Sequence, residues 1–157
     1  MDYTIRPAAP ADIDTLVAFT QQEAREAEGV ELDLEAVRRG VRGGFEDPPR
    51  ATYWAAETPD GRLVASTSVV TEWSNFHGGD YWWVQGLFIH AEHRGLGLAR
   101  QLLDHLSAEA AAAGAIELRL YVHDTNARAR RAYERCGFRT ALYSIMTRAV
   151  RAGMRTG

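Results

Sequence analysis

The spacing of apolar positions divides the chain into alternating helix-like and strand-like stretches. Residues 12–28 and 99–113 repeat apolar side chains every three or four positions, which predicts amphipathic helices. Residues 52–57, 63–71 and 81–89 are rich in β-branched and aromatic side chains, which predicts strands. Weaker patterns predict two further helices and three further strands, at 34–41, 126–136, 3–6, 116–122 and 138–146. The resulting order, β-α-α-β-β-β-α-β-α-β, describes a mixed sheet flanked by helices.

Glycine and proline positions support this division. The turn 58–61, Thr-Pro-Asp-Gly, joins two strands and predicts an antiparallel hairpin. Residues 73–80 contain two glycines and are predicted to be a loop. Gly86 lies inside an otherwise bulky strand, which predicts a bulge or a close approach of the backbone to something else.

Length and composition indicate an ordinary globular protein. With 157 residues, 46% of them hydrophobic and 25% charged, the chain is expected to be a single domain over residues 1–157. Its net charge of -3 argues against a nucleic-acid partner. Five arginines nevertheless gather in one short C-terminal stretch, at positions 128, 130, 131, 135 and 139. Such a cluster suits a small anion, although a run of charges alone is more often a solvated helix face.

The location expected from the sequence is cytoplasmic. Cys136 is the single cysteine, which excludes an intrachain disulfide and fits a reducing compartment. The N-terminal residues are too polar for a signal peptide, and no apolar run reaches membrane-spanning length. We therefore expect no membrane association.

The chemistry-bearing stretch is residues 90–103, which read as a strand exit, a glycine-bearing turn and a helix start. A helix start exposes unpaired backbone N–H groups and the positive end of the helix dipole, and together these bind phosphate groups. Gly95 and Gly97 allow a ligand to approach the main chain closely, and Arg94 adds a forked cation. This stretch predicts a site for a phosphate-bearing ligand.

A second pattern follows at residues 126–138. Asn126, Ala129 and Tyr133 are three and four positions apart, so they share one helix face. Gly137 is placed to end that helix, and Phe138 to begin a strand.

With these two patterns in this order, the chain resembles the GNAT superfamily of acetyl-CoA-dependent N-acetyltransferases. The resemblance implies an α/β fold with a mixed, mostly antiparallel sheet of about six to seven strands and about four flanking helices. It also implies acetyl-CoA as the acyl donor. The generic alternative of a nucleotide-binding domain is weaker, because the glycine turn lacks the Gly-Lys-Ser/Thr ending of a P-loop.

The resemblance assigns donor-binding roles to particular residues. The coenzyme A pyrophosphate would rest on the backbone of the turn, formed by Arg94, Gly95, Leu96, Gly97, Leu98 and Ala99. The acyl arm would run along the strand residues Leu87, Phe88 and Ile89. Asn126 would hydrogen-bond the donor. One or more of the arginines at 128, 130 and 131, with Arg130 as the candidate, would meet the 3′-phosphate.

The resemblance also implies catalytic roles, with one departure. Tyr133 would protonate the departing thiolate, the alternative being a core tyrosine on an amphipathic helix. Many relatives carry a glutamate where this chain has Gln85, and an amide cannot act as a base. Glu72 is the favoured base; His77, Asp80 and a water chain remain alternatives, and Gln85 becomes a water-orienting residue or a substrate contact. We expect no acetyl-enzyme on Cys136.

The acceptor side of the predicted site is aromatic. Strand alternation sends Trp82 and Trp83 to opposite faces, so one of them packs in the core and the other, with Trp83 as the candidate, would join Trp73 and Phe76 in a wall that binds an ammonium group by cation–π contact. Gln85 is a further candidate substrate contact, and the alternative for the aromatic residues is core or dimer packing. The histidines show no metal-ligand spacing, so no metal is expected. The predicted function is acetyl transfer to the primary amine of a small molecule by direct attack. Alternatives are acetylation of a protein N-terminus or lysine, and a non-catalytic coenzyme-A-binding module. An aromatic strand edge would allow a homodimer.

Overall fold

The sheet and helices follow the predicted order as far as the fourth helix. The computed structural model describes residues 2–151 and 153. Its five strands are β1 Thr4–Pro7, β2 Thr52–Glu57, β3 Leu63–Ser74, β4 Gly79–Ile89 and β5 Glu117–Leu120. Its four α-helices are α1 Ile13–Glu28, α2 Leu34–Arg42, α3 Leu98–Ala112 and α4 Ala127–Arg135. The strands lie in the order β1-β2-β3-β4-β5, antiparallel except for the parallel pair β4–β5.

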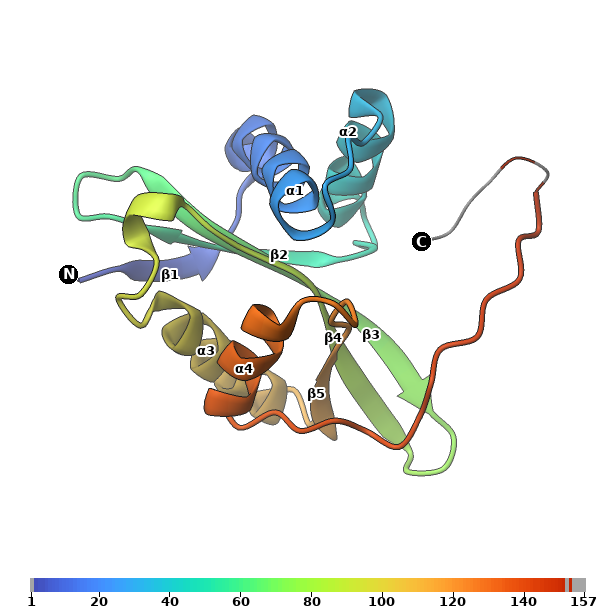
Figure 1. Cartoon of the computed structure of the whole chain (residues 1–157). Coiled ribbons are helices and arrows are strands. Elements are labelled where there is room, and N and C mark those ends of the chain that lie inside the picture. Colours follow the sequence, from blue (N-terminus) through green and yellow to red (C-terminus); the bar gives the residue numbers. More distant parts are fainter. Residues whose placement is uncertain (1, 152, 154–157) are drawn as a thin grey trace.

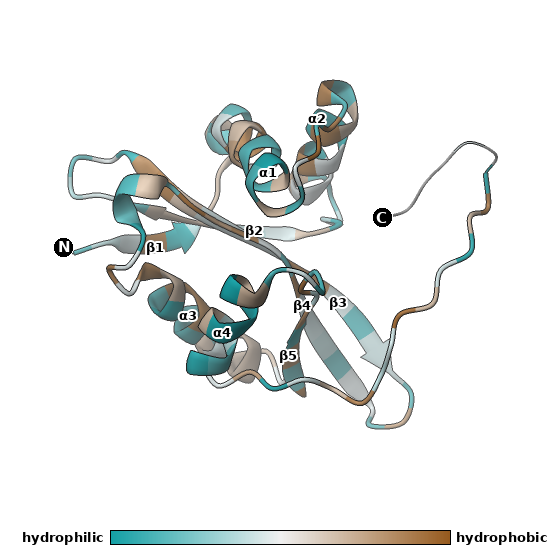
Figure 2. Ribbon diagram, viewed as in Figure 1, coloured by the Kyte–Doolittle hydropathy of each residue, from teal (hydrophilic) through white to brown (hydrophobic). Residues whose placement is uncertain are grey.

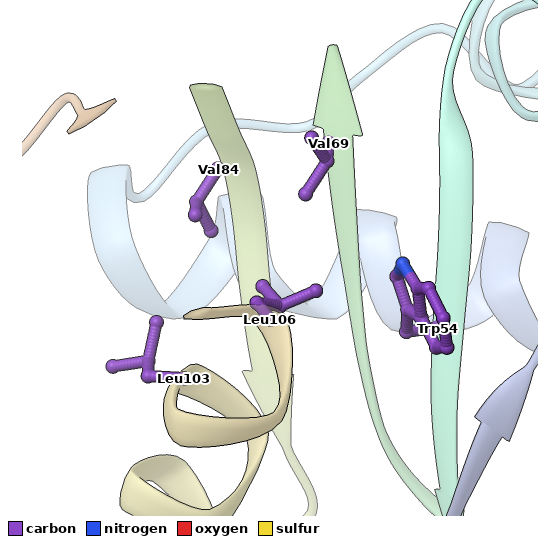
Figure 3. Packing of buried hydrophobic residues seen from close by; sticks show 5 residues of the cluster. All are labelled: Trp54, Val69, Val84, Leu103 and Leu106. Carbon is purple, nitrogen blue, oxygen red and sulfur yellow. The ribbon is translucent and has the colours of Figure 1, made fainter. Parts of the chain in front are cut away.

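Helices cover both faces of the sheet, with α1 and α2 on one side and α3 and α4 on the other (Figure 1). The larger core lies between the sheet and α3, where Trp54, Val69, Val84, Leu103 and Leu106 pack together (Figure 3). On the opposite side, a separate apolar cluster holds α1 to α2, formed by Leu16, Val17, Val37 and Val41. The two layers fix α1 and α3 on opposite sides of β4, and β4 carries the candidate site.

Strand β4 changes partners along its length. Its first part pairs with β5 as far as Val84 and Leu120, whereas its second part continues to Ile89 with no β5 partner. Across β3, the register skips one residue, because Ser68 lies opposite Gly86 but Val69 lies opposite Val84. Gln85 is therefore the extra residue of a β-bulge, which confirms the bulge predicted at Gly86. The bulge marks the point where β4 and β5 separate.

Two sequence predictions at the sheet are wrong. Residues 73–80 are not a loop throughout, since β3 extends to Ser74 and β4 begins at Gly79, with Trp73 opposite Asp80. The strand predicted at 138–146 does not form, so the described residues make a sheet of five strands instead of about six to seven. Beyond α4 the chain continues as an extended segment that then leaves the body of the molecule and carries hydrophobic stretches (Figures 1 and 2). The apolar residues of this segment have no neighbouring strand among the described residues to pack against, and Leu142 and Met146 are exposed.

No described helix has the length and apolar character needed to cross a membrane.

Candidate active site

The turn before α3 has the geometry of an anion-binding loop. Gly95 and Gly97 adopt left-handed backbone angles, with φ of 75° and 81°, and Gly97 is the N-cap of α3. No side chain caps this helix start, so its first N–H groups lack the partner that most helices supply from an N-cap residue. A Cβ built on either glycine would meet no atom within 4 Å, which shows open space beside the loop. Leu98 anchors the helix in the core, being 1% exposed.

Arg94 ties this loop to its surroundings. Its Nε donates to the carbonyl oxygen of Ile89 at 2.8 Å, and its guanidinium forms an ion pair with Glu26 of α1. The side chain therefore bridges β4 and α1 and lies beside the loop. An anion bound at the loop would compete with Glu26 for this guanidinium.

The second half of β4 meets α1 directly. Phe88 stacks on Phe19 of α1 with ring centroids 4.5 Å apart, whereas Leu87 packs into the core on the other face. One turn after Phe19, the carboxylate of Glu23 accepts a hydrogen bond from the Leu87 N–H at 3.2 Å. Two backbone groups of β4 beyond the bulge are thus engaged by side chains, the Leu87 N–H by Glu23 and the Ile89 carbonyl by Arg94.

A pocket of about 260 Å³ lies between α1 and the sheet at the bulge. Its walls are mostly hydroxyl-bearing, and they come from four elements: Thr20, Glu23, Tyr53, Ser66, Thr67, Ser68, Gln85 and Gly86. Glu23 is the one ionisable carboxyl among these lining residues. Burial raises its pKa above the ordinary value, the Leu87 N–H opposes this rise, and the charge of Glu28 adds to it. The pocket therefore presents a carboxylate whose proton is held more tightly than usual.

Tyr133 of α4 lies within the electrostatic reach of Glu23. Burial raises its pKa to about 12, and the nearby Glu23 and Cys136 add to this effect. Its ring packs against the main core and meets Phe138 edge-to-face, with centroids 5.9 Å apart. The phenol therefore keeps its proton at neutral pH, as a proton donor must.

The other donor-side residues lie at the start of α4. The Asn126 side-chain oxygen caps this helix by accepting from the Ala129 N–H at 3.0 Å. Because an asparagine amide also has two N–H donors, this role leaves the nitrogen available to a ligand. Arg130 donates to the Thr140 hydroxyl at 3.2 Å on an exposed face.

The predicted aromatic wall does not surround the pocket. Trp73 and Phe76 are 66% and 87% exposed at the far end of the β3–β4 hairpin, and of the predicted acceptor residues Gln85 is the one that lines the pocket. Trp83 stacks on Tyr121. The cation in this aromatic region is the chain's own Arg119, whose guanidinium carbon lies 3.4 Å from the ring centroid of the neighbouring Tyr81 and 5.7 Å from that of Trp83.

Glu72 lies in the same aromatic region. Its carboxylate accepts from Trp83 Nε1 at 2.9 Å and lies 3.9 Å from the Arg119 guanidinium. The side chain is 53% exposed and lines no part of the pocket.

Sequence reasoning missed Glu23 and the hydroxyl-bearing walls. A signal was present, because Glu23 continues the buried stripe of α1 set by Leu16 and Phe19, at spacings of three and four residues. A carboxylate on the apolar face of an amphipathic helix is unusual and indicates either a buried partner or a site. In the part of the chain that the structure describes, no group of three His, Cys, Asp or Glu side chains could hold a metal ion.

Comparison with known proteins identifies the class. The sequence profile of the "Acetyltransferase (GNAT) family" matches residues 13–138, which include the pocket, the glycine loop and α4. The chain belongs to this family and is an acyltransferase. No curated protein matches it.

Solved structures agree with this assignment. A possible acetyltransferase from Clostridium difficile 630 is 27% identical, with a TM-score of 0.88 over 94% of this chain and 97% of that one. A ribosomal-protein-alanine N-acetyltransferase from Brucella melitensis biovar Abortus 2308 is 20% identical, with a TM-score of 0.75 over 94% of this chain and all of that one. At that identity the second likeness concerns the fold alone.

Proposed function

We propose that the protein transfers the acetyl group of acetyl-CoA to the primary amine of a small molecule, by direct attack in a complex that holds both substrates. The observation that carries the proposal is the pocket beside the β4 bulge. Its volume of about 260 Å³ suits a small molecule, since ligand pockets typically start near 300 Å³. Its polar walls suit an acceptor with several hydrogen-bonding groups.

The donor site of this proposal combines the glycine loop, the part of β4 beyond its pairing with β5, and the start of α4. The uncapped amides from Gly95 to Ala99 would hold the pyrophosphate, and Arg94 would exchange Glu26 for a phosphate oxygen. The main chain from Leu87 to Ile89 would line the acyl arm. Asn126 would donate from its amide nitrogen, and Arg130 is the candidate partner of the 3′-phosphate.

Tyr133 is the proposed general acid. Its raised pKa keeps the hydroxyl protonated, so that it can supply a proton to the sulfur as the thioester bond breaks. Direct transfer needs no protein nucleophile. The role of Glu72 as base stays a prediction from sequence, and its position outside the pocket directs attention to another carboxylate.

A turnover screen tests the function. Purified protein is incubated with acetyl-CoA and, separately, with polyamines, amino acids, aminoglycosides and N-terminal peptides, while thiol release is followed. We expect release with at least one small amine and none with acetyl-CoA alone. The chain has 18 arginines and no lysine, so acetylation of its own lysines cannot imitate turnover. Release with peptides alone would favour a protein substrate, and binding of coenzyme A without release would favour a non-catalytic module.

A further inference from the structure

We propose that Glu23 is the acceptor-binding carboxylate and the general base of this enzyme, and that its substrate is a small primary amine bearing further hydrogen-bonding groups such as hydroxyls. This inference rests on the proposed function. It assigns to α1 a role that the sequence prediction gave to the end of β3.

The first argument is the position of Glu23. The Leu87 N–H fixes its carboxylate against β4 at the bulge, directly after the last residue that pairs with β5. The next residues of β4 are those proposed to line the acyl arm. A carboxylate at this point lies where the acceptor pocket meets the part of β4 proposed to line the acyl arm, which is where the attacking nitrogen must be.

The second argument is the space that Gly86 provides. A Cβ built on this glycine would lie 2.9 Å from Glu23 Oε2 and 3.3 Å from Oε1. Such distances are too short for an unstrained contact, so the observed carboxylate position requires a residue without a side chain here. The bulge at Gln85 and the glycine that follows it together create the seat of the carboxylate.

The third argument is the charge of the pocket. Glu23 is the single charged side chain among the lining residues, and the others offer hydroxyls, one amide and backbone. A negative group in a partly buried polar pocket favours a cationic ligand, and an ammonium is the cation that an N-acetyltransferase must receive. The hydroxyls of Tyr53, Ser66 and Ser68 can then pair with polar groups on the rest of the acceptor.

The proton transfers balance as follows. The ammonium gives one proton to the Glu23 carboxylate, which later releases it to water, and the free amine attacks the thioester carbon. A C–N bond forms and the C–S bond breaks. The sulfur leaves with the hydroxyl proton of Tyr133, and the second proton from the nitrogen restores that hydroxyl. A base with a raised pKa is better matched to this task than an ordinary glutamate, which supports the assignment.

The test compares Glu23→Gln and Glu23→Asp with the wild-type protein. Glu35→Gln serves as a matched control, since Glu35 is exposed on α2 and lines no part of the pocket. We expect Glu23→Gln to lower kcat/KM for an alkylamine by ~10²–10⁴-fold at neutral pH. Affinity for acetyl-CoA, measured by calorimetry, should be unchanged. Glu23→Asp should recover part of the activity, and Glu35→Gln should behave as wild type.

Two further readouts separate a base from a merely structural residue. The loss of kcat/KM in Glu23→Gln should shrink as the pH rises toward the pKa of the amine. It should be small for an aniline, which is uncharged at neutral pH. Equal losses for both amines at every pH would overturn the assignment, and so would full activity of Glu23→Gln.

Amine binding without acetyl-CoA distinguishes failure of the inference from failure of the proposed function. We expect an amine substrate to raise the Tm of the wild-type protein and not that of Glu23→Gln. Turnover with an equal Tm shift in both proteins would refute the role of Glu23 and leave the proposed function standing. Absence of both turnover and an amine-dependent shift would refute the inference and the proposed function together.

Discussion

Two glutamates from other elements lie beside strand β4, and their surroundings differ. At the bulge, Glu23 comes from α1, is partly buried, and is held by the Leu87 N–H. At the hairpin end, Glu72 comes from β3, is 53% exposed, and is held by the Trp83 indole with Arg119 nearby. One carboxylate faces a pocket, and the other lies on an open aromatic surface.

This difference teaches that a carboxylate becomes a candidate base through what surrounds it. Glu23 lies between its own helix, α1, and the sheet, and no cation is among the residues that line its pocket, so its charge is costly and its proton is retained. Glu72 has water, an indole N–H and a guanidinium to satisfy it. A base must accept a proton from the acceptor, and a carboxylate already satisfied by its neighbours gains little from doing so.

Among the variants that follow, Tyr133→Phe has the largest expected effect, and it tests the proposed proton donor. Phenylalanine keeps the edge-to-face contact with Phe138 but cannot give a proton to the leaving sulfur. We expect kcat to fall by ~10²-fold or more, with affinity for acetyl-CoA retained. Single-turnover kinetics and calorimetry would measure the two quantities. Retention of kcat within about twofold would reduce Tyr133 to a packing residue.

A smaller effect is expected from Gly86→Ala, which moves the Glu23 carboxylate without removing it. The new methyl group would lie 2.9 Å from Glu23 Oε2, and the far end of a flexible side chain can shift away from it. We expect kcat/KM for the amine to fall by ~10-fold, because a displaced base loses part of its contribution.

Gly40→Ala is the matched control for that variant. Gly40 lies in α2, and a Cβ there meets no atom within 4 Å. It should leave activity unchanged and stabilise the helix by up to about 1 kcal/mol. Circular dichroism would show that both variants fold. If Gly86→Ala were fully active, the position of the Glu23 carboxylate would not matter for catalysis.

A change of a few degrees in Tm is expected from Glu23→Gln, and its sign depends on pH. The folded protein holds the Glu23 proton to a higher pH than the unfolded chain, in which the pKa has its ordinary value of 4.5. Stability therefore falls as the pH rises from 4.5 to the folded-state pKa and stays lower above it. The groups that act on this carboxylate are Glu28 and the Leu87 N–H; its own charge in turn raises the pKa of the Tyr53 and Tyr133 phenols, which are uncharged.

Glutamine carries none of this penalty. At neutral pH the variant should be more stable than wild type by up to about 1 kcal/mol, or ~2–4 °C in Tm, and near pH 4 the difference should vanish. Thermal melts across this range would measure it. A variant that lost activity and gained stability would show the trade-off typical of active sites, whereas equal melts at all pH values would argue against an unfavourable buried charge.

Much of the fold followed from the sequence because its signals are local. The glycine loop, the α3 and α4 helices and the bulge at Gly86 depend on residues within one or two turns of each other, and the structure confirms them. The last strand failed for the opposite reason. Apolar residues from 138 to 146 suit a strand, but a strand also needs a neighbouring strand, and the segment beyond α4 leaves the body of the molecule (Figure 1).

The candidate site was only half predictable for the same reason. Its donor side lies on two contiguous motifs. Its acceptor side is assembled from α1, β2, β3 and β4, and Glu23 contacts a residue 64 positions away. The sequence prediction chose Glu72 because it is near Gln85 along the chain. The fold instead places α1, and with it Glu23, over the bulge. A polar residue at a buried helix position was the single clue that did not require the tertiary structure.

The smallest effect is expected from Glu72→Gln, and it tests the comparison most directly. The amide can still accept from the Trp83 indole, and the Glu72 side chain of the ion pair with Arg119 is exposed. We therefore expect the free energy of unfolding to fall by about 0–0.5 kcal/mol. We expect kcat/KM for the amine to change by less than about twofold at every pH, in contrast to the pH-dependent loss in Glu23→Gln. A loss of kcat/KM equal to that of Glu23→Gln would show that the general base is Glu72, at the hairpin end of β4. The acceptor would then enter over the aromatic surface, and the hydroxyl-lined pocket would need another explanation.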